Sequence, residues 1–393
     1  NNDIMERPSI AMRPRAYKDG KVYSVLPING AADLDFTRAT SATSFNATRV
    51  ENDNEIQEVA SNTPRLDYSG NGCPSLLLEP ESTNLITYSE PTTDENSSGG
   101  VTYESFDWGI NFSNCVRFGD NLTTGWWYGG TVETGKEYTL SCYVIMDDLS
   151  EPVPSPNTSS GDFSVIIGGS LVADINNITV TNVTGNIWRV SAKRIATINL
   201  NNNGIAKYEN QSAKGFRVVG WQLEELSYAT SYIPTSGAIE TRVAETLSKD
   251  SISDYINSYK GVLYVEIKAL DNKSPFKVIS ISEGGDVNKR ITLGFKGDTT
   301  AFYYKDSSSN NLILSSTDVF SYNKIAIKYD NQEVKFFLNG ELINTDSKQL
   351  DIDFNSIHFN AGDTNTESFY GNIKDLRVYT TALTDEELTQ LTS

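Results

Sequence analysis

The sequence has little of what metal and nucleophile chemistry require. Its 393 residues include one histidine and three cysteines. A single imidazole excludes a multi-histidine metal site and leaves a serine nucleophile without a suitable base, since His358 lies in a strand-like run, 356–360. Cys73, Cys115 and Cys142 cannot all pair within one chain and lack zinc-ligand spacing. We expect these thiols to be small apolar core residues.

Basic charge and long apolar runs are also scarce. Lysine and arginine number 32 against 51 acidic residues, for a formal net charge of −19. Such a surface repels phosphate backbones, so nucleic acid is not an expected partner. No apolar stretch approaches the roughly 20 residues that span a bilayer, and no signal-peptide pattern is present. We therefore expect neither membrane insertion nor export.

Short alternating runs separated by turn residues are abundant. Hydrophobic residues make up 38% of the chain, with 28 glycines and 12 prolines, which suits folded β modules, and the length favours two globular units. In 323–329, Ile325, Ile327 and Tyr329 share one face, the pattern of a half-buried strand. Asn339-Gly340 between two such runs predicts a hairpin. The fold class is therefore all-β, with two antiparallel β-sandwiches.

The N-terminal part differs from the rest. Residues 1–35 combine prolines with scattered basic residues and show little periodicity, so they are interpreted as an extended arm that contacts other subunits. Residues 36–85 contain short extended pieces broken by turns such as Asn71-Gly72, and are interpreted as a docking or attachment segment.

Two sets of motifs resemble known families. The strings FTRATSAT and PRLDYSGNGCPSLLLEPESTNLITYSE resemble a segment of bacteriophage tail-fibre and other virion adhesion proteins. GKEYTLSCYV, NIWRVSAK and GWQLEELSYATSYIPTSGAIETR resemble the carbohydrate-binding-module-like jelly roll that follows this segment there. This resemblance covers roughly residues 36–245 and implies a jelly roll over 86–245.

The C-terminal part resembles laminin-G-like, concanavalin A-like sandwiches. The motifs are the hairpin KFFLNGELI and the last strand FYGNIKDLRVY, and the resemblance covers about 246–393. A short helix after this strand is predicted to begin at Thr384, with Glu387 completing a capping box.

Catalytic groups are not apparent. Glycoside hydrolysis needs two carboxylates held across the bond, and concanavalin-type hydrolases carry theirs at alternate positions of one strand. Glu266-Ile267-Lys268 breaks that alternation, and Asp351 with Asp353 is better explained as a solvent-facing edge. We therefore expect a protein that is not an enzyme, with a glycan-cleaving hydrolase or lyase as the alternative.

Sugar binding requires an exposed aromatic ring with polar side chains beside it. Trp126, Trp127 and Tyr128 lie between turn-rich segments and are the first candidates, followed by Trp108. Trp188 and Trp221 occupy strand positions and are expected in a core. In the second sandwich the candidates are Tyr303, Tyr304 and Arg290.

Metal and cofactor requirements are expected to be small. Asp363 and Asn365, in a turn of the second sandwich, are weak candidate ligands for a structural calcium ion. No cofactor is required by the expected function.

The resemblances together imply a bacteriophage virion structural protein, a tail fibre or a head fibre or decoration protein, that binds host-surface carbohydrate without cleaving it. It would be made in the host bacterial cytoplasm and exposed on the particle, as a homo-oligomer, with a trimer expected from the resemblance. A purely architectural virion subunit is the further alternative.

Overall fold

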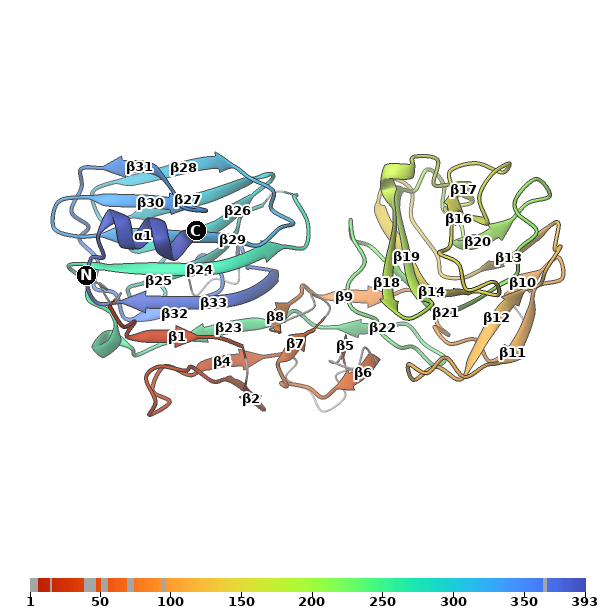
Figure 1. Ribbon diagram of the computed structural model, residues 1–393, viewed down its shortest axis with the longest axis horizontal. Coiled ribbons are helices and arrows are strands. Elements are labelled where there is room, and N and C mark those ends of the chain that lie inside the picture. Colours follow the sequence, from red (N-terminus) through yellow and green to blue (C-terminus); the bar gives the residue numbers. More distant parts are fainter. Residues whose placement is uncertain are drawn as a thin grey trace. The chain divides into compact units, whose positions relative to one another are not determined.

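A computed structural model describes residues 6–14, 16–38, 47–50, 56–68, 74–93, 96–273, 275–362 and 366–393. Almost every regular element in these residues is a β-strand (Figure 1). The chain divides into two compact units. Unit 1 comprises residues 1–40, 61–80 and 244–393, and unit 2 comprises 41–60 and 81–243. In chain order, the larger part of unit 2 is an insertion between two segments of unit 1.

Unit 1 is a sandwich of two sheets. Sheet A has the strand order β31-β30-β29-β24-β33-β8-β7, with β1 beside β33. Its strands are β1 (Ile10–Met12), β7 (Arg65–Asp67), β8 (Ser75–Leu78), β24 (Gly261–Ala269), β29 (Asn323–Tyr329), β30 (Val334–Leu338), β31 (Glu341–Asp346) and β33 (Gly371–Tyr379).

Sheet B has the strand order β2-β3-β4-β23-β32-β25-β26-β27-β28. Its strands are β2 (Tyr17–Lys18), β3 (Lys21–Val22), β4 (Leu34–Thr37), β23 (Thr246–Lys249), β25 (Lys277–Ser282), β26 (Arg290–Lys296), β27 (Thr299–Lys305), β28 (Asn310–Ser316) and β32 (Ser356–His358). A 3₁₀ turn, η2 (Ser253–Tyr255), follows β23.

The core of unit 1 lies between these sheets. Successive strand residues point to opposite faces, so Leu263 and Val265 of β24 pack inward with the apolar residues of sheet B. Between them in the sequence, Tyr264 faces outward and packs with the helix α1 (Asp385–Thr392) through Leu388 and Leu391. The inner and outer faces of sheet A therefore have separate hydrophobic clusters.

Strands β1 and β4, near the N-terminus, contribute to this core. Ile10 and Met12 of β1 are fully buried, and β1 pairs with β33 near the other end of the chain. Leu34 and Phe36 of β4 join the same cluster. Within unit 1, the described part of the segment interpreted as an arm is thus packed as strands. A role in contacting other subunits stays a prediction.

Unit 2 is a second sandwich. Sheet C has the order β10-β13-β20-β16-β15, with β17 beside β16, and sheet D has the order β11-β12-β21-β14-β19-β18. Sheet C contains β10 (Ser97–Ser98), β13 (Gly125–Tyr128), β15 (Pro154–Ser155), β16 (Phe163–Ile167), β17 (Ser170–Leu171) and β20 (Gly204–Lys207). Sheet D contains β11 (Thr102–Ser105), β12 (Asn114–Phe118), β14 (Glu137–Met146), β18 (Ile178–Thr184), β19 (Ile187–Ile195) and β21 (Phe216–Glu224).

Smaller elements complete unit 2. Two antiparallel two-stranded sheets pair β5 (Ala47–Val50) with β6 (Ile56–Val59), and β9 (Ser82–Asn84) with β22 (Glu240–Arg242). A 3₁₀ turn, η1 (Ile175–Asn177), precedes β18. The core between sheets C and D combines aliphatic side chains with several aromatic rings. Phe118 of β12 stacks on Phe216 of β21, with ring centroids 4.5 Å apart. Large rings in a small sandwich bury much apolar area per residue.

Several sequence predictions are confirmed. The described part of the chain is all-β apart from α1 and two 3₁₀ turns, and is built from antiparallel sandwiches in which β15 and β16 form a parallel pair. Asn339 and Gly340 have φ of 49° and 87° and form the predicted turn between β30 and β31. Thr384 caps α1 in a capping box with Glu387. Cys115 and Cys142 are buried, whereas Cys73 and the Asn71-Gly72 pair lie outside the described residues.

Within the described part of the chain, no helix has the length and apolar character needed to cross a membrane.

Candidate functional site

Strand β13 divides its three aromatic rings between two faces of sheet C. Trp127 is 1% exposed and belongs to the core, whereas Trp126 and Tyr128 are half-buried on the opposite face. The rings of Trp126 and Tyr128 lie with centroids 6.1 Å apart and an interplanar angle of 18°. We call this pair the aromatic platform. The sequence offers all three rings as candidates, and strand alternation leaves two of them outside the core.

Small residues lie beside the platform in sheet C. Trp126 pairs with Ala206 and Tyr128 with Gly204 on β20, while Ser164 on β16 follows Ala206 in the same row. A Cβ atom on Gly204 would lie 1.9 Å from the main-chain oxygen of Trp127, so the close approach of these strands requires glycine. Because no bulky side chain flanks the rings on β20, their faces are not covered from that strand.

Polar groups hold the next part of this surface in place. Gln211 donates through Nε2 to Ser164 Oγ at 2.8 Å and accepts through Oε1 from the Tyr208 amide at 3.0 Å. Ser164 in turn donates to the main-chain oxygen of Asn157 at 2.8 Å. Asn157 and the segment 209–210 between Tyr208 and Gln211 are exposed. The exposed side chains are the amides of Asn157 and Asn210 and the carboxylate of Glu209, all of which can bind hydroxyl groups. They belong to the segments that contact Ser164, which lies in the same row as Trp126.

The Tyr128 phenol keeps its proton over the whole physiological range. Burial raises the pKa of Tyr128 to about 12, and the neighbouring Tyr208 adds to the shift. A protonated phenol can both donate and accept a hydrogen bond. The platform therefore presents the same hydrogen-bonding groups at neutral and mildly alkaline pH.

Trp108, a candidate from the sequence, is 4% exposed and packs in a second hydrophobic cluster of unit 2. Its ring meets those of Phe106 and Phe112 edge to face, at 5.7 and 6.3 Å. This burial corrects the expectation that Trp108 presents a ring for stacking, because a ring enclosed by other aromatics offers no face to a sugar. Trp221 is fully buried, as predicted, and Trp188 is half-buried.

The candidates of the second sandwich are separated by the same alternation. Arg290 lies over the half-buried ring of Tyr303, 5.2 Å from its centroid. Tyr304 is 3% exposed and belongs to the core of unit 1. Its hydroxyl group donates a hydrogen bond to Asp346 Oδ2. The structure therefore brings Arg290 and Tyr303 together and removes Tyr304 from a binding surface.

The calcium prediction is not addressed, because Asp363 and Asn365 lie outside the described residues. Among the residues that are described, no group of three or more His, Cys, Asp or Glu side chains could hold a metal ion.

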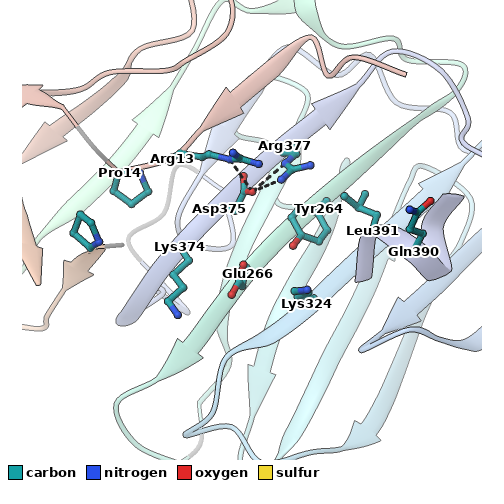
Figure 2. Close-up of a pocket in the computed structure, with 11 residues that line it drawn as sticks. Arg13, Pro14, Tyr264, Glu266, Lys324, Lys374, Asp375, Arg377, Gln390 and Leu391 are labelled. Carbon is teal, nitrogen blue, oxygen red and sulfur yellow. Dashed lines mark hydrogen bonds and ion pairs between the residues drawn. The ribbon is translucent and has the colours of Figure 1, made fainter. Parts of the chain in front are cut away.

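A pocket on the outer face of sheet A was not predicted from the sequence. Its volume is about 420 Å³, within the range of small-molecule sites. Strands β24, β29 and β33, the segment after β1, and α1 all contribute to it (Figure 2). It is lined by Arg13, Pro14, Pro74, Tyr264, Glu266, Lys324, Lys374, Asp375, Arg377, Gln390 and Leu391.

A β-bulge in β33 supplies one of the charges of this pocket. Glu266 of β24 pairs with Asp375, but the next residue, Ile267, pairs with Ile373, so Lys374 has no partner on β24. Ile373 is a core residue, and both Lys374 and Asp375 line the pocket. The extra residue places two consecutive side chains on one face, a common device beside binding sites.

Asp375 is the centre of an ion-pair network in the pocket. Its Oδ2 atom accepts from Arg377 Nε at 3.0 Å and Nη2 at 2.6 Å, and from Arg13 Nε at 3.3 Å (Figure 2). The Arg377 guanidinium also lies over the Tyr264 ring, 5.4 Å from its centroid. Two guanidinium groups therefore share one carboxylate oxygen, so the charge of Asp375 is already paired within the protein.

Tyr264 is a poor base for the same pocket. Burial raises its pKa, and the carboxylates of Glu266 and Asp375 raise it further, so the phenol stays protonated. The groups gathered here can bind charge and hydroxyls more readily than they can transfer a proton.

Comparison with known proteins supports the concanavalin-type assignment of the C-terminal part. Residues 263–389 match the family model of the concanavalin A-like lectin/glucanases superfamily. These residues fall within unit 1 and within the stretch for which the sequence predicts a laminin-G-like sandwich. No curated protein matches the chain.

Solved structures that resemble parts of the chain come from several organisms. The CBM40 of a Ruminococcus gnavus IT-sialidase, bound to alpha2,3 sialyllactose, has 21% identity and a TM-score of 0.30, over 34% of this chain and 83% of that one. Domain 4 of AbnA, a GH43 extracellular arabinanase from Geobacillus stearothermophilus in complex with arabinotriose, has 19% identity and a TM-score of 0.32, over 38% and 73%. The binding domain of botulinum neurotoxin DC in complex with rat synaptotagmin II has 18% identity and a TM-score of 0.31, over 38% and 40%.

Proposed function

We propose that the protein is a structural adhesion component of a bacteriophage virion that binds host-surface carbohydrate without cleaving it. The observation that carries the binding part is the aromatic platform of Trp126 and Tyr128 on the outer face of sheet C. The two rings are nearly parallel and half-buried, and they provide an aromatic surface outside the core. The C–H face of a pyranose stacks on such a surface, and this geometry is a general mode of sugar recognition.

The position of the platform in the sheet supports this use. Trp127, between the two rings, anchors β13 in the core, so the flanking side chains are held by a rigid strand. The neighbours of the two rings on β20, Ala206 and Gly204, are small, so no bulky side chain of that strand lies against the rings. Binding sites held on strands are better ordered than sites on loops, and less conformational entropy is lost when a ligand binds.

The virion part of the proposal rests on the sequence resemblance over residues 36–245. That resemblance implies attachment to other virion subunits, exposure on the particle surface and a trimer. Several copies on one particle would multiply weak single-site affinities into useful avidity. A modest platform with two rings is therefore sufficient for attachment.

The binding proposal is tested with a glycan array probed by the full chain, followed by calorimetry on the glycans that bind. Trp126→Ala is expected to weaken binding about tenfold, because stacking is lost, and Trp126→Phe to retain most of it. Tyr88→Ala is the matched control, since Tyr88 is an exposed tyrosine of the same unit, 42% exposed, outside the platform. Equal loss in the control and in Trp126→Ala would exclude the platform as the site.

Two further readouts separate the alternatives. New reducing ends or unsaturated products after incubation with host polysaccharide would identify a hydrolase or a lyase instead of a binder. Antibody labelling of purified particles tests the virion assignment. Labelled particles combined with no glycan or host-cell binding would favour a purely architectural subunit.

A further inference from the structure

We infer that the pocket on the outer face of sheet A is a binding site for a saccharide unit that carries a carboxylate, such as a uronic acid residue. The pocket belongs to unit 1, so it is separate from the aromatic platform of unit 2. Its ligand chemistry follows from the charges that line it and from which of them are already neutralised.

The side chains that line the pocket have a positive net charge, whereas the whole protein has a negative one. Four cationic side chains line it, against two carboxylates, Glu266 and Asp375, whereas the whole chain carries a formal net charge of −19. The cations are Arg13, Lys324, Lys374 and Arg377. A local excess of positive charge in an acidic protein attracts an anionic ligand to that place and away from the rest of the surface.

Two of the four cations have terminal nitrogens that already contact oxygen atoms of the protein. Arg377 contacts Asp375 through Nε and Nη2, and Lys324 donates to the main-chain oxygen of Ser393. The other two are Arg13 and Lys374. These carry the charge that a ligand can neutralise.

Arg13 and Lys374 are positioned at the pocket but not saturated. The Arg13 side chain is 46% exposed and reaches Asp375 through Nε alone among the described residues, so its terminal nitrogens remain for a ligand. Lys374 lies over the Tyr322 ring, 3.8 Å from its centroid, and forms no ion pair with any described residue. The bulge in β33 turns this lysine toward the same face as Asp375.

The geometry of the two cationic groups, a guanidinium and an ammonium, favours a carboxylate as the ligand. The end of a guanidinium group matches the two oxygens of a planar carboxylate, and an ammonium group adds a point charge. Glu266, also on this face, forms no ion pair within the described chain and would repel a second negative charge. It can instead accept from sugar hydroxyls, with Gln390 as a further donor and acceptor. The pocket thus suits a singly charged, hydroxyl-rich unit.

The test is calorimetry of the full chain with trigalacturonate and with its methyl ester, which differs only in the masked carboxylates. Trigalacturonate is expected to bind and the ester not to bind measurably, and binding should weaken as salt is added. Arg13→Gln and Lys374→Gln are each expected to weaken binding about tenfold, because a charge-assisted contact is lost. Lys374→Arg keeps the charge and is expected to bind nearly as well as the wild type.

Lys296→Gln is the matched control, because Lys296 also lies over an aromatic ring, Phe276, at 4.6 Å, but in sheet B. Thermal unfolding of each variant shows whether it is folded. Trp126→Ala should leave trigalacturonate binding unchanged, so failure of the platform and failure of this pocket are distinguishable. Absence of trigalacturonate binding, equal binding of the ester, or equal loss in Lys296→Gln would overturn the inference.

Discussion

Trp127 and Trp221 stack face to face in the core of unit 2, with ring centroids 3.9 Å apart and an interplanar angle of 15°. One ring comes from β13 of sheet C and the other from β21 of sheet D, so the stack joins the two layers of the sandwich. Trp126, one residue away, lies on the opposite face of the same strand. Neighbouring tryptophans therefore have different roles, one in packing and one at the surface.

This division predicts stability losses of different size for two adjacent substitutions. Trp127→Ala removes a fully buried ring and its stacking partner, and should lower the free energy of unfolding by about 3–5 kcal/mol. Trp126→Ala removes a ring that is outside the core and should lower it by less than about 1 kcal/mol. Urea denaturation followed by circular dichroism measures both. Similar losses for the two variants would contradict the assignment of Trp126 to the surface.

A buried ionic cluster joins three parts of unit 1. Glu245 accepts from Arg38 Nη1 at 2.9 Å and from Arg65 Nε at 2.8 Å through Oε1, and from Arg65 Nη2 at 2.5 Å through Oε2. Arg65 Nη1 lies 2.8 Å from Glu79 Oε2. Glu79 and Glu245 stand just before and just after the long insertion in the chain, so the cluster holds both ends of that insertion within unit 1.

Glu245→Gln should be strongly destabilising. The substitution leaves two buried guanidinium groups with one carboxylate between them, and removing one partner of a buried ion pair typically costs about 3–5 kcal/mol. Chemical denaturation of the full chain provides the measurement. Glu225→Gln is the control, because the Glu225–Lys136 pair is exposed and its loss should leave the unfolding transition unchanged. A Glu245→Gln variant as stable as this control would show that the cluster contributes nothing.

Much of the fold could be predicted because its long strands repeat a pattern locally. The alternation of Ile325, Ile327 and Tyr329 identified β29, and the Asn339-Gly340 pair identified the hairpin after β30. The contribution of β1 to the core could not be recognised in this way. Its three residues are too few for periodicity, and its partner β33 lies near the other end of the chain.

The sites were predictable in residue type but not in orientation. The ring-rich segment of β13 was recognised from the sequence. Which of its rings face the core depends on how β13 pairs with β10 and β20, and this pairing buries Trp127 and leaves Trp126 on the outer face. The pocket on sheet A was missed because it combines residues from six segments of the chain. Its Lys374 reaches that face only through a bulge, and strict alternation of the sequence assigns Lys374 and Asp375 to opposite faces.

Asp306 should make the stability of unit 1 decrease as the pH falls in the acid range. Burial opposes its ionisation, but hydrogen bonds from the amides of Ser308 and Ser309, at 2.9 and 2.8 Å, and Lys348 at 3.1 Å outweigh burial. They hold the pKa of Asp306 well below its ordinary value of 3.8. The stabilisation is therefore complete above the unfolded-state pKa, at about pH 4, and is lost as the pH falls toward the lower folded-state pKa.

The test compares Asp306→Asn with the wild type in thermal and urea unfolding over a range of pH. The variant should be less stable by about 1–3 kcal/mol near neutral pH, because the charge-assisted hydrogen bonds are weakened. Below about pH 4 the difference should shrink. A difference that is constant over the whole range would mean that the ionised carboxylate is not the stabilising group.

Cys115 and Cys142 should be unreactive in the folded protein. Cys115 is fully buried in the second hydrophobic cluster of unit 2, and Cys142 is 1% exposed in the core. Burial raises the pKa of Cys115 to about 12, with Glu104 adding to the shift, and burial also raises the pKa of Cys142. Because the thiolate is the nucleophile, a protonated and enclosed thiol reacts slowly with alkylating reagents. Iodoacetamide at mildly alkaline pH, followed by peptide mass spectrometry, should leave both residues unmodified in the native chain and modify both in guanidinium chloride; native labelling at the rate of a free thiol would contradict their placement in the core.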